Sequence, residues 1–121
     1  MFELLINLIP IALLIVVCDL PWLYASSSTV QPMIKKIQGG MPLEVKWAAA
    51  VPVYFALAYL VQVADSTPQA GLIGLSTYAV YDFTNLATLK NYSLEFAVAD
   101  SLWGGILFMI VRELGLRLGL L

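Results

Sequence analysis

The chain has 121 residues, of which 61% are hydrophobic and only 12% are charged, so it holds more apolar surface than one water-soluble core of this size could bury. The net charge is −2, and the six basic residues form no stripe that could follow a phosphate backbone, so nucleic acid is not an expected partner. One cysteine and no histidine leave the usual zinc, haem and iron–sulfur ligand sets unfilled. We therefore expect no metal site and no cofactor.

Four segments have the roughly 20 mostly apolar residues that a membrane-spanning helix needs. In chain order they cover about residues 2–24, 46–63, 70–89 and 94–116. The first segment carries Glu3 where a signal peptide has basic residues, and it shows no cleavage step, so we expect it to be a retained span. The sequence predicts a single all-α domain, residues 1–121, that crosses the membrane four times.

The first connection, residues 25–45, is the longest. An SSST run together with Pro32 and Gly39 breaks the hydrophobic pattern, which predicts a loop. Within it, apolar residues recur at helical spacing around Lys35 and Lys36. Proline suits a first helical turn and glycine a helix end, so we expect a short interfacial helix here, lying on the membrane surface.

The other two connections are short and polar. Residues 65–68 read Asp-Ser-Thr-Pro, which offers capping side chains followed by a proline suited to a first turn. Residues 90–93 form a tight polar turn. Because short links place consecutive helices side by side, the sequence predicts an antiparallel four-helix bundle with both termini on one side.

The distribution of basic residues gives an orientation. Loops one and three hold four lysines, whereas the opposite side holds only Arg112 and Arg117. An excess of Lys and Arg marks the cytoplasmic side of a membrane protein. The bias therefore predicts that loops one and three are cytoplasmic.

Three carboxylates, Asp19, Asp82 and Asp100, fall inside the predicted spans. Each is five to seven residues from the span end on the side of loops one and three, which places all three on the order of 10 Å below that side. An acid in mid-bilayer costs about 2.5–3.5 kcal/mol, so each has to face the bundle, water or a partner. We expect one polar layer, with Lys46 and Lys90 at its rim. Protonation, the rim lysines or a bound cation would have to compensate the charge, and these alternatives stay open.

Further polar and aromatic residues accompany these acids. Tyr78 lies four residues before Asp82, and Asn85 lies three residues after Asp82 and four after Tyr81, so these side chains share a face of the third span. Trp22 and Trp103 each follow an aspartate by three positions, and the alternative for both is an aromatic belt at the membrane surface. The whole cluster is either a pathway or pocket for a polar solute, or a set of interhelical hydrogen bonds that only fixes helix register.

Residues 78–90 read YAVYDFTNLATLK and carry the pattern Y-x-x-Y-D-x-T-N-x-A-T. This resembles the third span of an uncharacterised family of membrane proteins, domain of unknown function 2177. DLPWL at residues 19–23 is similar to the family's D-x-x-W-L in the first helix, and DSLWG at residues 100–104 is similar to its D-x-x-W-G in the last. The resemblance implies a four-span protein, but it supplies no activity and no catalytic residue.

Two functions from different classes fit these features. The first is an accessory or structural component of a larger membrane assembly, with lipid and other subunits or further copies of the chain as partners. The alternative is a proton, cation or small-solute transporter or channel that uses the Asp and Asn cluster. A dry, fully hydrogen-bonded layer would favour the first, whereas an opening from the layer would favour transport. We predict no enzyme activity and no catalytic residue; a lipid-directed enzyme is the least favoured reading, because the chain has no histidine and no metal ligand set.

Overall fold

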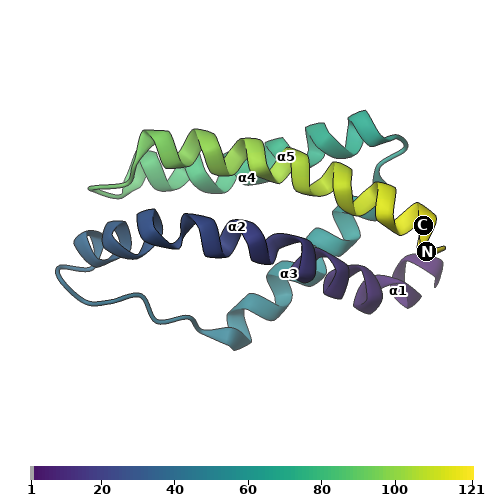
Figure 1. Cartoon of the computed structure of the whole chain (residues 1–121), viewed down its shortest axis with the longest axis horizontal. Helices are drawn as coiled ribbons and strands as arrows, with labels where there is room; N and C mark the ends of the chain where they lie inside the picture. The colour runs from purple at the N-terminus through teal and green to yellow at the C-terminus, as the bar shows by residue number, and fades with distance from the viewer. Residues whose placement is uncertain (1) are drawn as a thin grey trace.

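The computed structural model describes residues 2–121, and all regular secondary structure in this part of the chain is helical. Five helices follow one another: α1 (Phe2–Ile6), α2 (Leu8–Ile37), α3 (Trp47–Val63), α4 (Thr67–Thr88) and α5 (Leu94–Arg117). Figure 1 shows that α1 and the end of α5 lie at the same end of the molecule. The all-α prediction is confirmed. By length and composition, α2 and α5 can cross a membrane, and α3 is a shorter apolar helix.

The first loop differs from the expectation. A span at residues 2–24 followed by a separate interfacial helix was expected, but α2 is one uninterrupted helix of 30 residues. The serine run continues the helix because the hydroxyls of Ser26 and Ser27 donate to the backbone carbonyls of Trp22 and Tyr24, each at 2.7 Å. The prediction of a separate surface helix is therefore wrong, and its residues form the last turns of α2.

Proline and glycine set the two ends of α2. Pro10 has no N–H to donate to the carbonyl four residues earlier, which explains why α1 and α2 separate at Asn7. At the other end Gly39 and Gly40 have φ of 65° and 101°, a region that glycine enters without strain. The N–H of Gly40 donates to the carbonyl of Lys35 at 2.8 Å, which closes the helix end. The predicted stop at Gly39 is confirmed.

The short connections follow the expected capping chemistry. Ser66 precedes α4, and its hydroxyl accepts from the backbone N–H of Gln69 at 3.2 Å, with a proline in the first turn. Ser93 caps α5 in the same way, accepting from Phe96 at 3.1 Å. Arg112 of α5 ties down the α3–α4 connection by donating to the carbonyl of Ala64 at 2.7 Å. These contacts hold the two links in place at opposite ends of the molecule.

The apolar core occupies the half of the molecule that contains the chain ends. It joins the first half of α2, the second half of α3, the start of α4 and the second half of α5, and its fully buried members include Ile11, Ile15, Ala58, Val61, Ala70, Leu107, Phe108 and Val111. Helices α4 and α5 approach most closely here, because Gly74 of α4 lies directly against the backbone of Gly104. The three aspartates, Asp19, Asp82 and Asp100, lie towards the other half.

Candidate functional site

The three aspartates come from three different helices. Asp19 is on α2, Asp82 on α4 and Asp100 on α5, and their exposed fractions are 4%, 0% and 8%. Burial of a carboxyl group costs free energy unless hydrogen bonds replace its hydration. The partners of each carboxyl therefore determine what this site can do.

Asp82 is the most deeply buried of the three. Its carboxylate accepts from the hydroxyl of Tyr92 at 2.8 Å and, over a longer distance of 3.5 Å, from the hydroxyl of Ser101. Its carboxyl group also lies within hydrogen-bonding reach of the carboxyl of Asp100. Two carboxyl groups this close repel each other when both are ionised, and a proton shared between them relieves this repulsion.

Asp19 and Asp100 accept from aromatic donors on neighbouring helices. The indole N–H of Trp103 and the hydroxyl of Tyr54 each donate to Asp19 at 2.8 Å. The indole N–H of Trp22 donates to Asp100, also at 2.8 Å. These bonds connect α2 to α5 in both directions and α3 to α2. Among residues 2–121, every hydrogen bond from a non-acidic side chain to the three carboxyls comes from a neutral donor.

The two tryptophans point into the bundle, in contrast to the aromatic-belt alternative. The rings of Trp22 and Trp103 stack with their centroids 5.9 Å apart, and the ring of Phe96 is also nearly parallel to that of Trp22, with the centroids 6.5 Å apart. Tyr92 meets Phe96 edge-on at 6.1 Å. The aromatic side chains thus form a continuous row beside the acids.

The remaining predicted residues lie around this layer rather than in it. Asn85 is half-buried next to the phenol of Tyr92. The ring of Tyr78 packs against the α-carbon of Gly104, and Tyr81 is 62% exposed. The two lysines expected at the rim, Lys46 and Lys90, are both exposed and donate to none of the three acids in the part of the chain that the structure describes.

Sequence reasoning missed three donors, namely Tyr54, Tyr92 and Ser101. A usable signal existed for Tyr54, because it lies eight residues after Lys46, about 12 Å into the second apolar segment, which is the depth estimated for the acids. Tyr92 belongs to a turn that looked like a simple polar link. Burial raises the pKa of Tyr92, so its hydroxyl stays protonated and able to donate at neutral pH.

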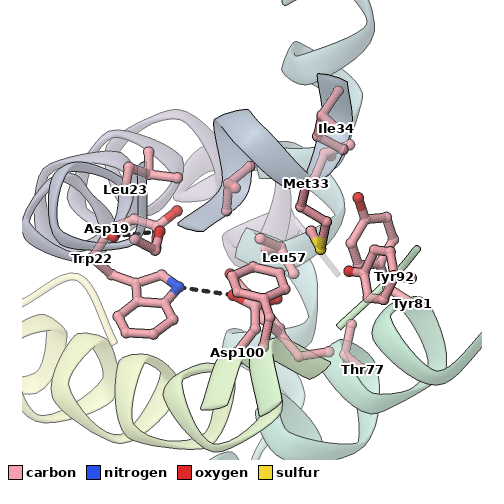
Figure 2. Close-up of a pocket in the computed structure, with 15 residues that line it drawn as sticks. Asp19, Trp22, Leu23, Met33, Ile34, Leu57, Thr77, Tyr81, Tyr92 and Asp100 are labelled. Atoms are coloured by element: carbon pink, nitrogen blue, oxygen red, sulfur yellow. Dashed lines mark hydrogen bonds between the residues drawn. The ribbon is translucent and has the colours of Figure 1, made fainter. Parts of the chain in front are cut away.

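A cavity of about 410 Å³ opens beside the acids. Asp19 and Asp100 line it, whereas Asp82 does not. Figure 2 shows Trp22 and Asp100 at one end of the cavity, with Met33, Ile34 and Tyr92 farther along it. All four long helices contribute to its wall, which consists of Asp19, Trp22, Leu23, Ser26, Val30, Met33, Ile34, Val53, Leu57, Thr77, Tyr78, Tyr81, Tyr92, Phe96 and Asp100.

Within residues 2–121 no three side chains of the His, Cys, Asp and Glu types are grouped so that they could hold a metal ion. The cavity instead combines two carboxyl groups with aromatic and aliphatic walls. Such a lining is suited to a ligand with both polar and apolar parts.

The comparisons with known proteins give one match. A family model described as "Predicted membrane protein (DUF2177)" matches residues 4–116. No curated protein and no solved structure matches the chain. The matched region includes all three aspartates and the whole wall of the cavity.

Proposed function

We propose that this chain, which belongs to the predicted membrane protein family DUF2177, is a four-span transporter that exchanges protons for another cation through the cavity lined by Asp19 and Asp100. The spans of this proposal are α2, α3, α4 and α5, in one domain. Loops one and three face the cytoplasm in this arrangement, following the distribution of lysine and arginine.

The lengths of α3 and α4 support four spans. At about 1.5 Å per residue, the 17 residues of α3 cover about 25 Å and the 22 residues of α4 about 33 Å, close to the roughly 30 Å thickness of the hydrocarbon layer. Large apolar side chains are exposed along both helices, including Val51 and Val53 on α3 and Leu72 and Val80 on α4. Lipid is the environment that such surfaces require.

The observation that carries the proposal is the pairing of two acids with an open cavity and neutral donors. The hydroxyl and indole groups around Asp19 and Asp100 carry no charge that would balance an ionised carboxyl. A cation in the cavity or a proton on the carboxyl group supplies this balance. Alternation between these two ways of compensating the charge is what exchange of a proton for a cation requires.

The accessory-subunit hypothesis has weaker support. It assigns the polar layer only to helix register, and Asp82, which is fully buried and hydrogen-bonded, fits that role. Asp19 and Asp100 do not fit it, because they line a cavity that other helices leave open. The exposed first turns of α3 do not favour a partner subunit, because contact with lipid explains their exposure equally well.

Proteoliposomes test this proposal. The protein is reconstituted with a pH-sensitive dye inside the vesicles, and sodium, potassium or an organic ammonium ion is added outside. We expect at least one of these cations to drive proton efflux above that of protein-free vesicles. The double variant Asp19→Asn, Asp100→Asn should reduce this efflux at least 10-fold, because neither side chain can then bind the proton or the cation by its charge.

Asp65→Asn is the matched control. Asp65 is an exposed acid in the α3–α4 connection, and its backbone N–H and carbonyl, rather than its carboxylate, bond to Gln69 and Arg112. Efflux through this variant should equal that of the wild type. The proposal is wrong if no added cation moves protons through the wild-type protein, or if the double variant transports as fast as the control.

A further inference from the structure

The residues that line the cavity favour one class of cation, which the proposed exchange by itself does not specify. Five of the lining residues are aromatic, six are aliphatic or methionine, and only two are acids. We infer that the cation bound between Asp19 and Asp100 is an organic ammonium-type ion that carries an apolar group, rather than an alkali or divalent metal ion. This inference rests on the proposed function and specifies its substrate class.

Most of the carboxyl oxygens of Asp19 and Asp100 already accept a hydrogen bond. Both carboxyl oxygens of Asp19 already accept a hydrogen bond, one from Trp103 and the other from Tyr54. One oxygen of Asp100 accepts from Trp22, and its carboxyl group also faces Asp82. Small inorganic cations take a shell of about six oxygen ligands, which this arrangement does not offer. A diffuse organic cation needs negative charge nearby but no such shell.

The aromatic rings in the cavity wall also favour an organic cation. Trp22, Tyr78, Tyr81, Tyr92 and Phe96 all line the cavity. The face of an aromatic ring attracts a cation within about 6 Å of its centre, and quaternary ammonium groups are commonly bound in this way. Trp22 and Phe96 are stacked nearly parallel, with 12° between their planes, next to the carboxyl of Asp100. Aromatic rings and an acid therefore occur on the same side of the cavity.

The rest of the cavity wall is mostly aliphatic. Val30, Met33 and Ile34 of α2, together with Val53 and Leu57 of α3, give the cavity an apolar wall. A hydrated metal ion gains nothing from this surface, whereas an apolar group on the ligand gains free energy when it leaves water and packs against it. Methionine at position 33 can adapt to ligands of different shape.

The test is calorimetric titration of the full chain in detergent with benzyltrimethylammonium, which combines a quaternary charge and an aromatic group. Tetramethylammonium has the charge without the apolar group, and benzyl alcohol has the ring without the charge. We expect benzyltrimethylammonium to bind at least 10-fold more tightly than either of these two probes. Equal affinity for all three, or no binding of benzyltrimethylammonium, would overturn the inference.

Two ring variants locate the site. Phe96→Leu removes a ring from the cavity wall, whereas Phe83→Leu removes a ring from the exposed surface of α4 outside it. We expect Phe96→Leu to weaken binding of benzyltrimethylammonium at least 5-fold and Phe83→Leu to leave it unchanged. Equal effects of both variants would place the binding elsewhere. If either variant fails to fold, the comparison of the three probes on the wild type still decides.

The two proposals fail in different ways. If sodium or potassium drives proton efflux from the proteoliposomes and benzyltrimethylammonium neither binds nor drives it, the exchange function stands and the substrate class is wrong. If benzyltrimethylammonium binds with the expected selectivity but no cation moves protons, the binding site stands and the exchange function is wrong.

Discussion

The half of the molecule that contains the chain ends and the half that contains loops one and three are built differently. The first half is packed with apolar side chains, and Phe108, Ile11 and Ile15 are completely buried in it. The second half holds the three aspartates, the aromatic row and the cavity. Figure 1 shows α2, α4 and α5 running through both halves, so the difference lies largely in their side chains.

This comparison separates what stabilises the bundle from what can bind a ligand. Close packing in the first half leaves little space, and polar groups are scarce there. In the second half the helices are held by hydrogen bonds from Trp22, Trp103 and Tyr54 to the acids, which hold helices together without filling all the space between them. We therefore expect substitutions in the first half to affect stability most, and those in the second half to affect binding most.

Phe108→Ala should have the largest effect. Phe108 is fully buried at the contact of α5 with α4. Removing its ring leaves a cavity, because the two helices are already in contact and cannot move closer to fill the space. We expect a loss of about 4 kcal/mol of unfolding free energy, measured by unfolding in mixed micelles. Phe83→Ala, at an exposed position, should cost less than about 0.5 kcal/mol. Similar costs for the two variants would show that the first half is not the stable one.

Gly74→Ala should follow. A methyl group at Gly74 would overlap the carbonyl oxygen of Gly104 and approach the ring of Phe108 to 2.6 Å, so α4 and α5 would have to move apart. We expect a cost of about 3 kcal/mol. At Gly71 the added methyl meets only the flexible end of Met109 at 2.9 Å, so Gly71→Ala should stay within about 1 kcal/mol of the wild type. The same thermal or denaturant unfolding assay compares the pair.

Tyr92→Phe tests the second half. The variant leaves the buried carboxyl of Asp82 without its closest donor, at an expected cost of about 2 kcal/mol at pH 7. Because burial raises the pKa of Tyr92 above the value of about 10 in an unfolded chain, the folded state binds the proton more tightly. The stability from this group is fully present below pH 10 and is lost as the pH rises above it.

Unfolding measured from pH 8 to pH 12 checks this dependence. The wild type should lose more stability above pH 10 than Tyr92→Phe does, because the variant has no phenol to ionise at that position. Tyr24→Phe is the control, because Tyr24 is 86% exposed. Its pH dependence should follow that of the wild type. An identical pH dependence of the wild type and Tyr92→Phe would contradict the role assigned to this hydroxyl.

Trp22→Phe should have the smallest effect on stability. It keeps most of the ring stack but removes the N–H that donates to Asp100, at a cost of about 1 kcal/mol. Trp47→Phe, at a residue that is 75% exposed, should change stability by less than about 0.5 kcal/mol. A cost for Trp22→Phe as large as that of Phe108→Ala would mean that the two halves contribute equally.

The extent of α2 shows where local sequence signals become ambiguous. Serine can end a helix by bonding to the backbone in another conformation, or continue it by bonding to a carbonyl one turn earlier. Ser26 and Ser27 do the latter, and Ser26 is buried. Helix continuation through residues 25–37 therefore depends on the packing of α2 against its neighbours, which a local pattern does not contain.

The sequence by itself determined the all-helical fold, the helix stop at Gly39 and the cap in the connection at residues 65–68. These properties depend on hydrophobicity, backbone conformation and spacing within a single segment, so they can be read locally. Only the tertiary structure decided that Trp103 and Tyr54 donate to Asp19, that Tyr92 covers Asp82, and that a cavity lies beside them. Those contacts depend on the rotation of each helix about its axis and on its neighbours, and packing between segments far apart in the chain sets both.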